Sequence, residues 1–83
     1  MADKEIMIYA LTTCIWCKKT LEWFKHEKIR FQHVFVDDLP EEEHKKVMKT
    51  VLELNPIGNF PVVRIGESVI VGFKPEEFEK AFK

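Results

Sequence analysis

With 83 residues, 46% of them hydrophobic and 33% charged, the chain should fold as a single domain over residues 1–83, because a compact domain usually needs roughly 50 to 200 residues. The 13 basic and 14 acidic residues are interspersed, which argues against binding to nucleic acid or to an anionic membrane surface. Residues 6–11 form an apolar run that is too short for a secretory signal or for the roughly 20 residues that span a bilayer, so we expect a cytoplasmic protein that works as a monomer.

The first predicted element is a strand over residues 5–11, a continuous apolar run of the kind that is buried on both faces of a sheet. A helix should follow from about Cys14 to Glu27, and the hydroxyls of Thr12 and Thr13 are its candidate N-caps. Apolar residues at helical spacing form its expected buried stripe: Cys17, Leu21 and Phe24.

A second strand is predicted over residues 31–36, where aromatic and β-branched residues are concentrated. We expect Asp37 or Asp38 to cap a second helix, with Pro40 in its first turn. Glutamates at positions 41–43 suit the positive N-terminal end of that helix. Its buried stripe should consist of four residues: Val47, Met48, Val51 and Leu54.

Two short apolar strands are predicted after a turn-rich loop, over residues 61–65 and 68–71. Gly66 and Glu67 would join them as a two-residue hairpin connection. A final helix should begin at Pro75 and turn three apolar residues inward: Phe78, Ala81 and Phe82. The resulting order, βαβαββα, predicts an α/β fold in which three helices flank a four-stranded mixed sheet.

Cys14 and Cys17 stand three positions apart, where a buried strand gives way to a helix. Disulfide exchange needs one thiolate that attacks and a second thiol that displaces the resulting mixed disulfide. Backbone N–H groups at a helix N-terminus stabilise a thiolate, so we expect Cys14 to attack and the shielded Cys17 to resolve. The catalytic pair would then cycle through a redox-active disulfide and need no tightly bound cofactor.

The same cysteine spacing also occurs in half of a zinc site, which needs two further ligands. Among His26, His33 and His44, no two have the three-to-five-residue spacing of zinc-binding pairs. The spacing therefore favours a redox pair without metal ligands. A metal or iron–sulfur binding module that uses Cys14 is a second hypothesis. A non-catalytic interaction domain is a third, and the presence of Cys14, Cys17 and Pro61 argues against it.

Three segments, Tyr9–Lys19 with its Cys-Ile-Trp-Cys motif, Phe60–Val63 and Val71–Phe73, resemble the glutaredoxin family of the thioredoxin superfamily, and the resemblance covers nearly the whole chain. It implies a thioredoxin-like (glutaredoxin) fold with Cys14 as nucleophile and Cys17 as resolving thiol. It also implies that Pro61 is cis and lies beside Cys14, and that the backbone of the preceding Phe60 pairs with an extended substrate.

The segment from Gly72 to Glu76, Gly-Phe-Lys-Pro-Glu, is similar to the Gly-Phe-Arg-Pro-Asp segment of the NrdH-redoxins. These are glutaredoxin-shaped proteins that take electrons from thioredoxin reductase. Leu11 stands where glutathione-using glutaredoxins usually have Lys or Arg. The resemblance therefore implies one of two electron donors, a disulfide reductase of the thioredoxin-reductase type or glutathione.

The residues expected around the cysteines are largely apolar. The predicted substrate-binding residues are Thr13, Trp16, Phe60, Pro61, Gly72 and Phe73. Charged carboxylates need charged or hydrogen-bonding partners when they lose water, whereas an apolar surface suits an extended protein segment. We therefore predict a protein-disulfide reductase. The alternative is a glutathione-dependent enzyme that removes glutathione from proteins. In that case Lys74 would replace part of the missing charged groups that bind the carboxylates of glutathione.

Overall fold

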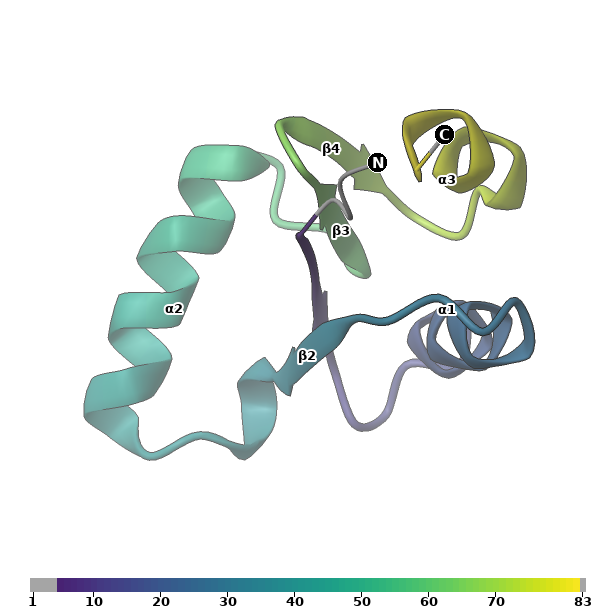
Figure 1. Ribbon diagram of the computed structural model, residues 1–83. Helices are drawn as coiled ribbons and strands as arrows, with labels where there is room; N and C mark the ends of the chain where they lie inside the picture. Colours follow the sequence, from purple (N-terminus) through teal and green to yellow (C-terminus); the bar gives the residue numbers. More distant parts are fainter. Residues whose placement is uncertain (1–4, 83) are drawn as a thin grey trace.

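The computed structural model describes residues 5–82, which form a mixed sheet with helices on both faces (Figure 1). In chain order its elements are β1 (Ile6–Ala10), α1 (Ile15–His26), β2 (Gln32–Phe35), the 3₁₀ helix η1 (Val36–Asp38), α2 (Glu41–Leu54), β3 (Val62–Ile65), β4 (Ser68–Val71) and α3 (Pro75–Phe82). The strand order is β2-β1-β3-β4. Strand β1 runs parallel to β2 and antiparallel to β3, which is antiparallel to β4, so the predicted βαβαββα order is confirmed.

Alternate side chains of the central strands point to opposite faces of the sheet and build two hydrophobic clusters. The cluster on the side of α1 and α3 consists of Ile6, Ile8, Leu21, Phe24, Val63, Ile65, Ile70 and Phe78. The cluster on the side of α2 consists of Tyr9, Val36, Val51 and Val62. Figure 1 shows α2 alone on one side of the strands, with α1 and α3 on the other. Because β1 is covered on both faces, its sequence is continuously apolar.

The start of α1 differs from the prediction. The helix begins at Ile15, and its N-cap is Cys14 rather than Thr12 or Thr13. The cap acceptor is a thiol sulfur, which cap preferences based on side-chain oxygens do not anticipate. The hydroxyl of Thr12 instead donates a hydrogen bond to Asp37. The predicted stripe of Cys17, Leu21 and Phe24 is confirmed, since all three are buried.

The segment between β2 and α2 also corrects two predictions. Strand β2 ends at Phe35, because Val36 already belongs to η1. The N-cap of α2 is Pro40, without a side-chain cap bond, so neither Asp37 nor Asp38 caps this helix. Of the four residues predicted for its buried stripe, Val51 is fully buried, and the other three are partly buried against the α2-side cluster.

The second half of the sheet follows the prediction, except that β3 begins at Val62, one residue after Pro61. Strands β3 and β4 form the expected hairpin, with Gly66 at a φ of 59°. Helix α3 begins at Pro75, and its Phe78 is fully buried. Across residues 5–82, no helix is long and apolar enough to span a bilayer.

Candidate active site

Cys14 lies between the carboxyl end of β1 and the first turn of α1. Its backbone N–H donates to the carbonyl of Leu11 at 3.2 Å. Its Sγ accepts a hydrogen bond from the backbone N–H of Cys17 at 3.2 Å and so satisfies one of the free donors of the helix start. The first turn of α1 contains no acidic residue, so no carboxylate on this turn offsets the positive end of the helix dipole. The side chain is partly exposed, so a substrate sulfur can approach it.

Cys17 lies one turn further along α1 and is completely buried. Its Sγ accepts a hydrogen bond from the backbone N–H of Leu11 at 3.5 Å. Burial, and then the interaction with the Cys14 side chain, raises the pKa of Cys17 from 9.0 to about 12. At neutral pH Cys17 is therefore a protonated thiol. The two sulfurs stand in different surroundings, one reachable from solvent and one shielded by the core.

Aromatic side chains from two distant segments meet beside the cysteines. Trp16, between the two cysteines, is 56% exposed. Its ring stacks on Phe73, from the connection between β4 and α3, with 6.0 Å between centroids and 27° between planes. Lys19 places its Nζ 5.1 Å from the centroid of the Trp16 ring, within the range of a cation–π contact. Ile15 is also exposed, so the start of α1 presents an apolar surface.

The segment before β3 supplies the remaining predicted residues. The peptide bond between Phe60 and Pro61 is cis, as the family resemblance implied. Gly72 has a φ of 94°, and its N–H donates to the carbonyl of Pro61 at 2.8 Å, which ties the end of β4 to the start of β3. Phe60 packs against the α2-side cluster, and Thr13 is exposed.

This sheet, with a cysteine pair at the start of its first helix, agrees with what comparison with known proteins shows. The family model for glutaredoxin matches residues 6–70. The chain belongs to the glutaredoxin family. It is 40% identical over 76 residues to an uncharacterized glutaredoxin-like 8.6 kDa protein in a rubredoxin operon of Clostridium pasteurianum, over 90% of this chain and 93% of that protein.

Two further similarities agree with this assignment. The crystal structure of methanoredoxin from Methanosarcina acetivorans superimposes with a TM-score of 0.90 and 39% identity, covering 94% of this chain and 83% of the other. The glutaredoxin-like protein NrdH of Lactococcus lactis is 27% identical over 75 residues, which covers 90% of this chain and 96% of NrdH. The thioredoxin-like fold and the membership in a family of thiol redox proteins are thereby confirmed.

Asp37, which the sequence predicted only as a possible helix cap, contacts the loop that precedes Cys14. The Asp37 carboxylate accepts hydrogen bonds from the Thr12 backbone N–H, at 3.0 and 3.2 Å, and from the Thr12 hydroxyl, at 2.7 Å. These bonds hold the pKa of Asp37 below its ordinary value. The sequence alone did not indicate this contact, because it depends on the register of the parallel strands β1 and β2, in which Ala10 pairs with Phe35. Thr12 and Asp37 each follow that pair by two residues, at the same edge of the sheet.

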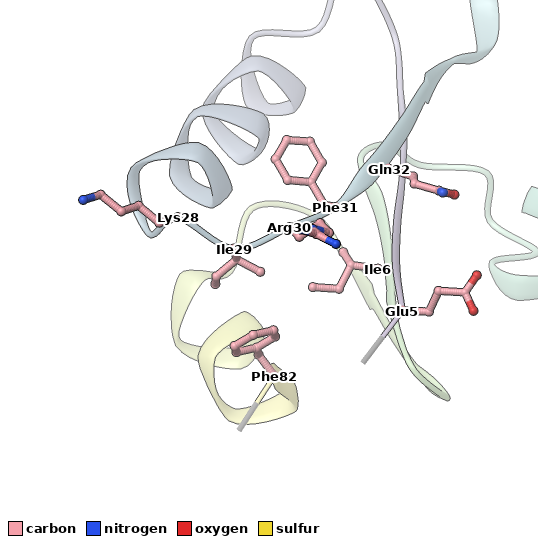
Figure 2. A pocket seen from close by; sticks show the side chains of 8 residues that line it. All are labelled: Glu5, Ile6, Lys28, Ile29, Arg30, Phe31, Gln32 and Phe82. Atoms are coloured by element: carbon pink, nitrogen blue, oxygen red, sulfur yellow. The ribbon is translucent and has the colours of Figure 1, made fainter. Parts of the chain in front are cut away.

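A pocket of the glutaredoxin lies at the other end of β1, away from the cysteines. It is lined by Glu5, Ile6, Lys28, Ile29, Arg30, Phe31, Gln32 and Phe82. In Figure 2 the side chain of Lys28 points away from the pocket, and Phe82 of α3 lies beside Ile29. Over the residues that the structure describes, no three His, Cys, Asp or Glu side chains are grouped so that they could hold a metal ion.

Proposed function

We propose that this glutaredoxin reduces disulfides in other proteins by dithiol exchange, with Cys14 as the attacking thiol and Cys17 as the resolving thiol. The observation that supports this best is the difference between the two sulfurs. Cys14 is partly exposed at the start of α1, whereas Cys17 is fully buried and its pKa is raised to about 12. A thiolate that attacks must reach its substrate, and a thiol that resolves must stay unreactive until the mixed disulfide has formed.

The exchange would proceed in two displacements. The Cys14 thiolate attacks one sulfur of the substrate disulfide, so that a Cys14–substrate bond forms and the other substrate sulfur leaves as a thiolate, which takes up a proton. Cys17 then loses its proton and attacks the Cys14 sulfur. The Cys14–Cys17 disulfide forms, the second substrate sulfur leaves and is protonated, and the substrate has gained two electrons and two protons.

The surface around Cys14 supports a protein segment as the substrate. Ile15 and Trp16 are exposed beside it, and Trp16 is held in place by its stack on Phe73. An extended segment could place apolar side chains on this surface while its backbone pairs with that of Phe60. Lys74, the cation that the sequence offers for a glutathione carboxylate, has its Nζ 4.0 Å from Oε2 of Glu77. Glutathione-dependent removal of glutathione from proteins is the alternative to be tested.

The protein would work in the cytoplasm. Its electron donor would be a disulfide reductase of the thioredoxin-reductase type, with glutathione as the alternative. Similarity to a protein named NrdH and the Gly-Phe-Lys-Pro segment support the first. The oxidised protein is to be reduced with NADPH and either thioredoxin reductase or glutathione plus glutathione reductase. We expect faster reduction by the first system, and faster reduction by the second would assign glutathione as the donor.

Replacement of each cysteine by serine tests the assigned roles. We expect Cys17→Ser to capture one substrate sulfur and then to stop at the mixed disulfide, since the thiol that resolves it is absent. Cys14→Ser should neither capture nor reduce. Insulin reduction measures turnover, and mass spectrometry detects the trapped adduct. If Cys14→Ser still reduced insulin while Cys17→Ser did not, the roles would be reversed.

A further inference from the structure

The link between Asp37 and Thr12 joins two segments that are 25 residues apart in the chain. All three of its hydrogen bonds end on one carboxylate, and bonds to an ionised acceptor are roughly twice as strong as bonds between neutral groups. The link connects η1, which follows β2, to the loop between β1 and α1. It therefore fixes the position of that loop by a contact outside the helix that carries the cysteines.

The loop that Asp37 holds contacts both cysteines through Leu11, the residue before Thr12. The Leu11 carbonyl accepts the backbone N–H of Cys14 at 3.2 Å. The Leu11 N–H donates to the sulfur of Cys17 at 3.5 Å and favours the thiolate of that residue. The φ and ψ bonds of Leu11 alone separate this donor from the peptide unit that contains the Thr12 N–H. A shift of Thr12 would therefore change these torsions and turn the donor relative to the sulfur of Cys17.

We infer that Asp37 is a positioning residue for the resolving step: by holding Thr12 it aims the Leu11 N–H at Cys17, so that this donor stabilises the thiolate as it attacks the mixed disulfide. The inference rests on the proposed dithiol function. Cys14 depends on this donor less, since its Sγ receives its hydrogen bond from Cys17 within α1. The Leu11 carbonyl binds only the backbone N–H of Cys14, whereas the Leu11 N–H reaches the sulfur of Cys17. Capture by Cys14 should therefore be much less sensitive to Asp37 than resolution by Cys17.

The negative charge of Asp37 raises the pKa of Cys17, whereas the Leu11 N–H that Asp37 helps to position lowers it. This charge is a minor contributor, after burial and the Cys14 side chain, to the raised pKa of Cys17. His44 of α2 favours the ionised carboxylate of Asp37, and Asp38 follows Asp37 in η1. Replacing Asp37 by asparagine removes the charge and keeps an oxygen that can accept the Thr12 N–H. Alanine removes both, so the two variants separate geometry from charge.

The test uses the reduced protein and one equivalent of an aromatic disulfide whose thiolate absorbs visible light. Capture by Cys14 releases the first aromatic thiolate, and resolution by Cys17 releases the second, so stopped-flow absorbance gives two separate rate constants. We expect Asp37→Ala to leave the first within about twofold and to slow the second about tenfold, since small misplacements of reacting groups cost on the order of ten- to a hundredfold. Asp37→Asn should stay within about twofold of the parent in both.

Asp38→Ala is the matched control, because Asp38 lies in the same 3₁₀ helix and makes no hydrogen bond to Thr12; both of its phases should match the parent. Thr12→Val removes only the 2.7 Å hydroxyl bond and should slow the second phase about threefold, so it decides the question if Asp37→Ala fails to fold. The inference is overturned if the second phase is unchanged in Asp37→Ala or Thr12→Val, if both phases slow equally, or if Asp37→Asn or Asp38→Ala slows resolution as much as Asp37→Ala. A parent protein that releases a single thiolate would instead refute the proposed function.

Discussion

The stack of Trp16 on Phe73 gives the recognition hypothesis a measurable magnitude. An offset aromatic pair contributes about 0.5 to 1.5 kcal/mol beyond the area that it buries, and 1.36 kcal/mol corresponds to a factor of ten in rate. If the stack keeps Trp16 ready to contact a protein substrate, Phe73→Ala should lower kcat/KM for a protein disulfide roughly twofold to tenfold. The loss should stay in this range because Lys19, on α1 itself, still lies 5.1 Å from the Trp16 centroid.

The assay compares a protein disulfide with a glutathionylated peptide, for the parent and for each variant. Phe73 also lies edge-on to Phe78, with 6.2 Å between centroids, so its truncation also affects the packing of α3. Phe73→Leu is the matched control, because leucine keeps apolar volume against Phe78 and removes the stacked ring. We expect Phe73→Leu to retain thermal stability and yet to lose efficiency on the protein disulfide. The reasoning is refuted if Phe73→Ala reduces the protein disulfide as well as the parent does, or if the parent prefers the glutathionylated peptide.

Two further predictions concern stability. The pKa of Cys17 is raised from 9.0 to about 12 in the folded protein, so the unfolded chain ionises first as pH rises. The reduced protein should therefore lose about 1 kcal/mol of its unfolding free energy per pH unit above pH 9. Urea titrations at pH 8 and 10 should show this loss for the parent, and an equal loss in Cys17→Ala would contradict it. Phe24 is fully buried in the cluster formed with the sheet and α3, so Phe24→Ala should lower the unfolding free energy by about 3 to 5 kcal/mol. Replacing its exposed neighbour, Lys25→Ala, should change that free energy by no more than about 0.5 kcal/mol. Similar urea midpoints for the two variants would rule out Phe24 as a core residue.

Local sequence patterns were sufficient for most of the fold. The continuous apolar run of β1 identified the central strand, because a strand covered on both faces needs apolar side chains on both. The spacing of Cys17, Leu21 and Phe24 gave the buried face of α1. The start of that helix was predicted incorrectly, since the choice among Thr12, Thr13 and Cys14 as cap depends on which side chain the rest of the fold leaves available. Thr12 was unavailable because Asp37 binds its hydroxyl.

The cysteine spacing by itself predicted that the two thiols lie close together at the start of a helix, because residues three apart are neighbours on a helix surface. The apolar stripe of α1 also predicted that Cys17 is shielded, whereas the pKa of its thiol depends on the tertiary structure. Cys17 owes its raised pKa first to burial under the core, and Trp16 meets Phe73 only because the end of β4 returns to the start of α1. Asp37 reaches Thr12 because two parallel strands end at the same edge of the sheet. A sequence determines such contacts only through the packing of elements that are distant along the chain, and that packing is what the structure supplies.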